Sequence, residues 1–451
     1  MTLQNNTMHQ TSGLSAERSS AVSGQDNNLN GLTVVEAATL IAKGQLSSEE
    51  LVLACLDRAL SRENDLYAWA YLNAEQAILE ARQRDKIGSS GLLHGVPIAV
   101  KDVYDVTGMT ATFGSPIYKD HFPSADAASV ALLRAAGAVI IGKTAAVEFS
   151  ASEPTKTRNP NNLAHTPGGS SSGSAAVVAD RQVAAATGTQ CGGSVIRPAA
   201  YCGIVGFKAS FGALCLAGTK MCSWSLDTGG VLTRNVADAA RMYAVMAGAK
   251  SVVINRSLSA PRVGIFLGPF AAQADECARS AVLDAAVKLG AKGVDVTSID
   301  APPEFERTLE AQRIIARYEM ARSLAYEWQF KRDLLSTRIQ AELIEGLAIS
   351  VERYRQAQNW ATAARSAIAS VLNNVDILLA IATTGEAPEG LGSTGSTTFN
   401  SSWSLSGNPC LCLPFNRGPR GLPIAIQLVG RFASDDQFLQ HAAFIENALS
   451  N

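Results

Sequence analysis

The chain has 451 residues, of which 47% are hydrophobic and 17% are charged, so it can build a large buried core. Its formal net charge is -2, and its Lys and Arg residues are spread along the chain, which argues against a nucleic-acid-binding protein because such proteins need a basic face. No segment approaches the roughly 18 consecutive apolar residues of a membrane span, so we expect no membrane partner.

The first 30 residues are rich in Ser, Asn, Gln and Thr and contain no apolar run. This composition predicts a flexible polar tail over 1–30, without a secretory signal. The chain contains eight cysteines but no CxxC pair, which favours reduced thiols and a cytoplasmic location. The folded domain is expected to cover 31–451.

Apolar periodicity predicts alternating helices and strands through that domain. In chain order we expect helices at 32–43, 47–61 and 74–84, a strand at 96–100, a helix at 127–136, a strand at 138–141 that Gly142 ends, a helix at 175–180, strands at 183–187 and 263–266, a helix at 277–289, strands at 377–381, 411–414 and 424–428, and a helix at 438–449. The mostly helical stretch 303–372 is expected to pack as a cover. The pattern predicts one large α/β domain whose central mixed, mostly parallel β-sheet carries helices on both faces.

Two glycine pairs run straight into a serine, at Ser170 and Ser194, and an apolar run (HGVPIAVKD) ends at Lys101. A serine hydroxyl needs a base to become a nucleophile, and without a GxSxG motif a Ser–His–Asp site is disfavoured. Burial can lower a lysine pKa by ~3–5 units, so Lys101 could be that base. It could instead pair with Asp102 or reach solvent. The combination favours acyl-transfer chemistry.

The turn at CGGS offers a second ingredient of that chemistry. Because glycine allows close approach of the backbone, the N–H groups of Cys191, Gly192, Gly193 and Ser194 can converge on one point and stabilise an oxyanion. The alternative for the GGSSSGSA stretch is a phosphate cradle. That stretch lacks the GK[ST] ending of a P-loop and the GxGxxG spacing of a dinucleotide site.

These residues resemble the amidase signature family. The resemblance covers the chain from about residue 32 onward and is carried by GVPIAVKD, GAVIIGKT, PGGSSSGSA, GGSVIRPAAYCG, DTGG and GLPIAIQLVGR. It implies a Ser–cis-Ser–Lys triad, with Ser194 as nucleophile, Ser170 as the bridging serine after a cis peptide, and Lys101 as base. It further implies a homodimer that needs neither a metal nor an organic cofactor.

The chain departs from the commonest family pattern beside the nucleophile. Gln190 and Cys191 stand where Asp and Thr are usual, and Arg197 falls three residues after Ser194. These features resemble malonamidase-type members and imply that Arg197 binds a substrate carboxylate; a purely structural arginine is the alternative. Gln190, Gly169 and Ser171 are further substrate-binding candidates. Candidates for the leaving-group pocket, by family position only, are Tyr104, Phe149, Met221, Trp224 and the segment 396–408.

The first functional hypothesis is an amidase that hydrolyses the C–N bond of a small, carboxylate-bearing amide such as malonamate. The alternatives are the glutaminase subunit of a tRNA-dependent amidotransferase and an aryl or acyl amide hydrolase. A catalytically silent binding protein is a third class, which the three filled triad positions disfavour.

Overall fold

The computed structural model describes residues 29–88, 90–249, 251 and 259–450. The predicted tail therefore lies outside the described residues, except for its last two positions. Leu29–Gly31 form a short 3-10 helix, η1, and Leu29 packs against the core. The described structure thus includes two residues that the sequence analysis assigned to the tail.

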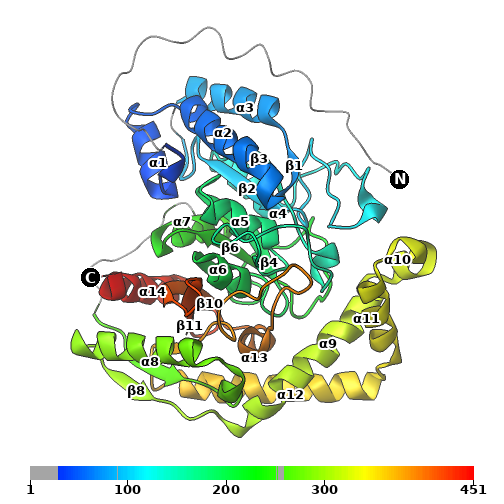
Figure 1. Cartoon of the computed structure of the whole chain (residues 1–451), viewed down its shortest axis with the longest axis vertical. Helices are drawn as coiled ribbons and strands as arrows, with labels where there is room; N and C mark the ends of the chain where they lie inside the picture. The colour runs from blue at the N-terminus through cyan, green and yellow to red at the C-terminus, as the bar shows by residue number, and fades with distance from the viewer. Residues whose placement is uncertain (1–28, 89, 250, 252–258, 451) are drawn as a thin grey trace.

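An 11-stranded sheet runs through the molecule in the order β1-β3-β2-β4-β6-β5-β10-β11-β9-β7-β8 (Figure 1). The strands are β1 (Trp69–Leu72), β2 (Pro97–Lys101), β3 (Val139–Thr144), β4 (Ala185–Gln190), β5 (Val205–Lys208), β6 (Thr228–Thr233), β7 (Val263–Phe266), β8 (Val296–Ser298), β9 (Ile377–Ile381), β10 (Cys410–Arg417) and β11 (Pro423–Val429). The predicted single α/β domain with a mixed sheet is confirmed.

The sheet is less parallel than we expected. Six of the ten neighbouring strand pairs are antiparallel, and parallel pairing is confined to β3-β2-β4 and β9-β7-β8. A parallel pair needs a long crossover, usually a helix, whereas a short turn forces antiparallel pairing. The short connection between β10 and β11 therefore makes this central pair antiparallel.

Helices cover both faces of the sheet, as predicted. They are α1 (Val34–Ala42), α2 (Ser48–Leu66), α3 (Ala74–Ile87), α4 (Ala128–Ala135), α5 (Ser172–Ala179), α6 (Ile196–Cys202), α7 (Val236–Met246), α8 (Glu276–Ala291), α9 (Thr308–Ser323), α10 (Ala325–Phe330), α11 (Thr337–Ala348), α12 (Val351–Val371), α13 (Thr398–Ser406) and α14 (Asp435–Ser450). Neighbouring side chains of β3 point to opposite faces of the sheet and so belong to different cores. Ile140 packs in the core covered by α4, α7 and α14. Ile141 packs in the core covered by α3, α5 and α6.

Strand β3 does not end at Gly142 as we expected. It continues to Thr144. A Cβ at position 142 would lie 2.4 Å from the carbonyl oxygen of Tyr71 on the neighbouring strand, so glycine is what allows the two backbones to pair there. Glycine here marks close approach of two backbones, not a stop signal. The short strands β1, β5, β6 and β8, and the helices α6, α7 and α13, were not predicted.

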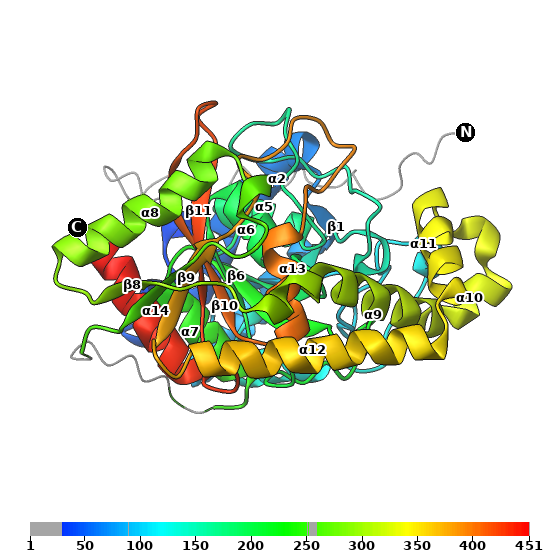
Figure 2. The same cartoon turned by 90° about the horizontal axis from the view of Figure 1, so that it is seen from below.

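The stretch 303–372 is helical, as predicted, and forms an arm beside the sheet. Helices α9 and α12 run past α13, and α10 and α11 extend the arm outward (Figures 1 and 2). Ala311, Ile315 and Ala357 from the arm share an apolar cluster with Leu405 of α13. The arm is thereby fixed next to the segment that follows residue 396. Among the described residues, no helix combines the length and apolar character needed to cross a bilayer.

Candidate active site

Lys101 lies at the end of β2 with its side chain fully buried. Its Nζ is 2.8 Å from Ser170 Oγ and 2.7 Å from Thr189 Oγ1. Successive residues of a strand point to opposite faces of the sheet, so Asp102 points away. Asp102 instead forms an ion pair of 2.8 Å with Lys143. The two alternative roles for Lys101, pairing with Asp102 or reaching solvent, are both excluded.

Burial is the main influence on the charge of Lys101. Desolvation lowers the pKa of its amine to about 7, while the nearby Asp227 and Cys222 oppose the shift. Burial also raises the pKa of Asp227, which weakens that opposition. A large share of the Lys101 amine is therefore uncharged at neutral pH and can accept a proton.

Ser170 follows a cis peptide bond from Gly169, as the family resemblance implies. It is fully buried and lies just before α5. The preceding carbonyl of Gly169 accepts hydrogen bonds from Nη2 (2.7 Å) and Nε (3.2 Å) of Arg197. The neighbouring Ser171 donates its N–H to the carbonyl of Ser194 at 3.3 Å, which joins the two serine-bearing turns.

The turn at residues 191–194 lines a cavity of about 490 Å³. Among the described residues, the N–H groups of Cys191, Gly192, Gly193 and Ser194 donate to no acceptor and remain free to bind an oxyanion. A Cβ at Gly193 would lie 2.5 Å from Asn400 Oδ1, so any larger residue there would have to displace the Asn400 side chain. In the described chain no hydrogen bond joins the hydroxyls of Ser170 and Ser194, so this link of the relay stays a prediction.

Two of the expected substrate-binding residues have structural roles. Gln190 Oε1 accepts the N–H groups of Val195 (2.9 Å) and Ile196 (3.1 Å) at the start of α6, and its Nε2 donates to Ser404. Ser171 is fully buried, and its hydroxyl lies 3.5 Å from the carbonyl oxygen of Thr189. Neither residue lines the cavity, so both hold the turns in place.

Arg197 does line the cavity, although its side chain is almost fully buried. Besides the Gly169 carbonyl, its guanidinium contacts the carbonyl oxygen of Gly395 through Nη1. No carboxylate of the described chain forms an ion pair with it. Burial lowers the pKa of Arg197 to about 10. It is therefore a buried cation, still charged at neutral pH, whose guanidinium has N–H groups left for a ligand.

The rest of the cavity wall comes from α9, α11, residues 150–152, Cys222 and the segment 393–401. Its other cations have acidic partners: Arg313 pairs with Glu345, Arg317 with Glu342 and Arg338 with Glu153. The segment 396–408 contributes Ser396, Thr397, Thr398 and Ser401, as expected. The structure does not bring the other pocket candidates, Tyr104, Phe149, Met221 and Trp224, into the wall.

Thr189 and Gln312 are site residues that the sequence analysis did not identify. Thr187 and Thr189 are two residues apart on β4, so their side chains share a face of the sheet. Thr187 Oγ1 accepts the N–H of Lys101, and Thr189 Oγ1 contacts the Lys101 amine. This period of two was the available signal. Gln312 of α9 donates to the carbonyl of Cys191 at 3.2 Å, a long-range contact that leaves no local signal.

Comparisons with known proteins identify the family of the chain. The Amidase family model matches residues 50–439. The chain is 38% identical over 321 residues to a glutamyl-tRNA(Gln) amidotransferase subunit of Oleidesulfovibrio alaskensis, covering 65% of each chain. It is 32% identical to the protein of the same name from Nitratidesulfovibrio vulgaris, covering 93% of this chain and 97% of that one. A solved structure described as an amidase superposes with a TM-score of 0.85 at 30% identity, covering 93% of this chain and 100% of the other.

The buried lysine, the glycine–serine turns and the matching family model together define the class of protein. The chain belongs to the Amidase family and is a hydrolase that acts on carbon–nitrogen bonds.

Proposed function

We propose that this amidase hydrolyses a small monoamide that carries a carboxylate, such as malonamate, to a carboxylate and ammonia or an amine. The proposal rests first on the 2.8 Å contact between Lys101 Nζ and Ser170 Oγ, made by a lysine whose pKa burial lowers to about 7. Such an amine can draw a proton through Ser170 without histidine.

In the proposed reaction, Ser194 Oγ attacks the amide carbon while its proton passes to Ser170 and the proton of Ser170 passes to Lys101. The free N–H groups of residues 191–194 stabilise the oxyanion. The carbon–nitrogen bond then breaks, and the proton returns to the leaving nitrogen. Water hydrolyses the ester on Ser194 by the same proton route, which releases the carboxylate and restores the free hydroxyl.

Arg197 supports an anionic substrate. It is the cavity cation without an acidic partner in the described chain, whereas Arg313, Arg317 and Arg338 are each paired. A guanidinium binds a carboxylate through two parallel hydrogen bonds, and burial strengthens that pairing. Its contacts with the carbonyl oxygens of Gly169 and Gly395 also position the backbone. The experiment must therefore separate binding of a substrate carboxylate from this positioning role.

The relatives named as amidotransferase subunits favour a second candidate, a glutaminase that releases ammonia for a partner enzyme. Glutamine carries an ammonium group as well as a carboxylate. Glu342 is the acidic side chain among the described cavity residues, and it is already paired with Arg317 at 2.6 Å. The cavity therefore suits a substrate with an anionic group alone better than it suits glutamine.

The test measures ammonia or amine release from malonamate, a neutral amide of similar size, glutamine and an aryl amide. We expect Arg197→Lys to lower kcat/KM for malonamate by about 10- to 100-fold, as ~1.5–3 kcal/mol for a hydrogen bond to a charged group implies, with a smaller loss on the neutral amide. Equal losses would leave Arg197 a positioning residue. Ser194→Ala should abolish turnover of every substrate. Glutamine as the preferred substrate, with stable binding of a second subunit, would favour the glutaminase.

The cytoplasmic location and the homodimer that the resemblance implies remain predictions. Light scattering during size-exclusion chromatography would give the mass of the particle in solution and test the homodimer directly.

A further inference from the structure

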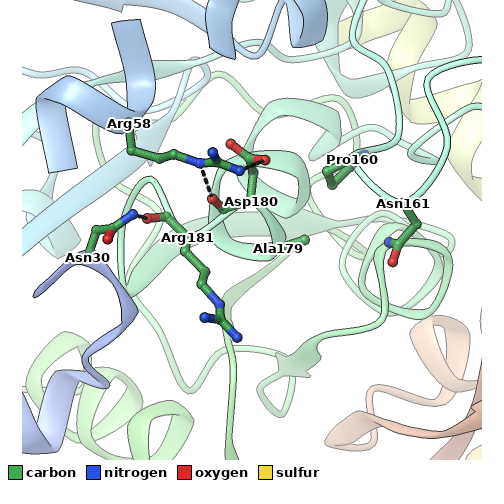
Figure 3. A pocket seen from close by; sticks show the side chains of 7 residues that line it. All are labelled: Asn30, Arg58, Pro160, Asn161, Ala179, Asp180 and Arg181. Carbon is green, nitrogen blue, oxygen red and sulfur yellow. Dashed lines mark hydrogen bonds and ion pairs between the residues drawn. The ribbon is translucent and has the colours of Figure 1, made fainter. Parts of the chain in front are cut away.

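A second cavity, of about 370 Å³, lies beside the C-terminal end of α5 (Figure 3). Its polar lining comes from four separate segments, with side chains of Asn30, Arg58, Asn161, Asp180 and Arg181. None of these residues lines the catalytic cavity. Helix α5 begins beside the catalytic serines and ends here, so its eight residues, about 12 Å at 1.5 Å per residue, separate the two sites.

Arg181 has a backbone conformation that side chains disfavour. Its φ is 59°, in the left-handed region, immediately after the C-cap residue of α5. Its N–H donates to the carbonyl of Val178, and the next N–H, of Gln182, donates to the carbonyl of Val177. This pattern of two bonds ends many helices and normally places glycine where Arg181 stands. The fold by itself would favour glycine, so the arginine side chain needs another reason to be there.

The guanidinium of Arg181 has no acidic partner in the described part of the chain. The adjacent Asp180 is already occupied, because its carboxylate accepts from Arg58 (2.7 Å), Arg62 (3.3 Å) and Gln182 (3.0 Å). Figure 3 shows the Arg181 side chain extending away from the Arg58–Asp180 pair. The cavity therefore carries a positive charge that its own carboxylate does not neutralise.

The donors that remain suit an anion with several oxygen atoms. Arg58 uses Nε and Nη2 on Asp180, which leaves its Nη1 group without an acceptor among the described residues. Asn30 donates to the carbonyl oxygen of Arg181 at 3.1 Å and so fixes the segment that carries the free guanidinium. A planar guanidinium fork binds phosphate through two hydrogen bonds.

We propose that this cavity binds a phosphate-class anion, with the unpaired guanidinium of Arg181 as its two-pronged partner. The anion is either inorganic phosphate or the phosphate group of a small phosphomonoester. The site does not depend on the reaction proposed for the catalytic cavity.

The test is isothermal titration calorimetry of the full chain with inorganic phosphate and, separately, with glycerol phosphate. We expect binding to the wild type and at least tenfold weaker binding to Arg181→Gly and Arg181→Asn. Both replacements accept the left-handed conformation, so these variants should fold and melt no lower than the wild type. Amide hydrolysis should be unchanged in both. Arg355→Gln, which removes one exposed charge from α12, is the matched control and should bind like the wild type.

Tighter binding of glycerol phosphate than of phosphate would identify a phosphomonoester as the ligand, and tighter binding of phosphate would identify the free ion. Three results would overturn the proposal: no binding of either compound to the wild type, unchanged binding to the Arg181 variants, or an equal loss in Arg355→Gln. The last result would mean that net charge, not this cavity, attracts the anion.

Discussion

At the scale of single residues, the site depends on one amine that the fold keeps out of water. The backbone N–H of Lys101 is held by Thr187, and its amine contacts two hydroxyls, those of Ser170 and Thr189, without a carboxylate partner in the described chain. Hydroxyl groups stabilise an ammonium less than a carboxylate would, so burial decides the equilibrium. In the proposed reaction, this lets Lys101 act as a base near neutral pH.

The pH dependence of catalysis follows from that shift. Because burial lowers the pKa of Lys101 to about 7, the amine gains a proton as the pH falls below that value, and kcat/KM should decrease about tenfold for each further pH unit. A pH–rate profile on a neutral amide would check this, since the substrate then does not titrate. A flat profile down to pH 5 would contradict a neutral lysine base.

Thr189 offers a test of how the amine is positioned. Thr189→Val removes a hydrogen bond of 2.7 Å that favours the ammonium form, so the pKa of Lys101 should fall further and the acidic limb of the profile should move to lower pH. We also expect kcat to fall, by about tenfold, because the amine loses one of its two hydroxyl contacts. Thr189→Ser keeps the hydroxyl and should keep the limb in place. Identical profiles for all three proteins would remove Thr189 from the site.

At the scale of elements, the helical arm forms one wall of the candidate active-site cavity and needs tight contact between α9 and α11. Gly346 of α11 allows that contact, since a Cβ there would lie 2.1 Å from the carbonyl oxygen of Arg317 on α9. Arg317 and Met320, from the same helix, line the cavity. The spacing of the two helices therefore sets the shape of the site.

Gly346→Ala should push α11 away from α9. We expect a loss of ~1–3 kcal/mol in the free energy of unfolding and a higher KM, because the cavity wall moves. Gly290→Ala is the control: Gly290 lies in α8 with nothing within 4 Å of the added Cβ, so this variant should gain up to ~1 kcal/mol. Urea unfolding and initial rates would measure both effects. An unchanged stability in Gly346→Ala would show that the arm adapts.

At the scale of the whole molecule, the two halves of the chain form one sheet. Strands β1–β6 come from residues before 234 and β7–β11 from residues after 262, and they meet where β5 pairs with β10. Asn400, from the second half, lies against Gly193 in the first. The turn at residues 191–194 is thus supported across the junction.

A chain divided between Met246 and Val263 should therefore fail as separate halves. Each half would expose an unpaired central strand, which promotes aggregation. We expect both halves to be insoluble when expressed alone and to recover soluble protein with amidase activity only when expressed together. Activity in the first half alone would show that the serine and lysine groups need no support from the second.

The amino-acid sequence by itself determined the α/β class, the helical stretch at 303–372, and the family to which the chain belongs. These features depend on local periodicity and on short motifs such as GGS and the apolar strand ending at Lys101, which keep their meaning without knowledge of distant contacts. Only the tertiary structure decided the antiparallel centre of the sheet, the contact of Thr189 with Lys101, and the structural roles of Gln190 and Ser171. Each of these depends on which distant segments meet, and that is set by packing across the sheet rather than by neighbours in sequence.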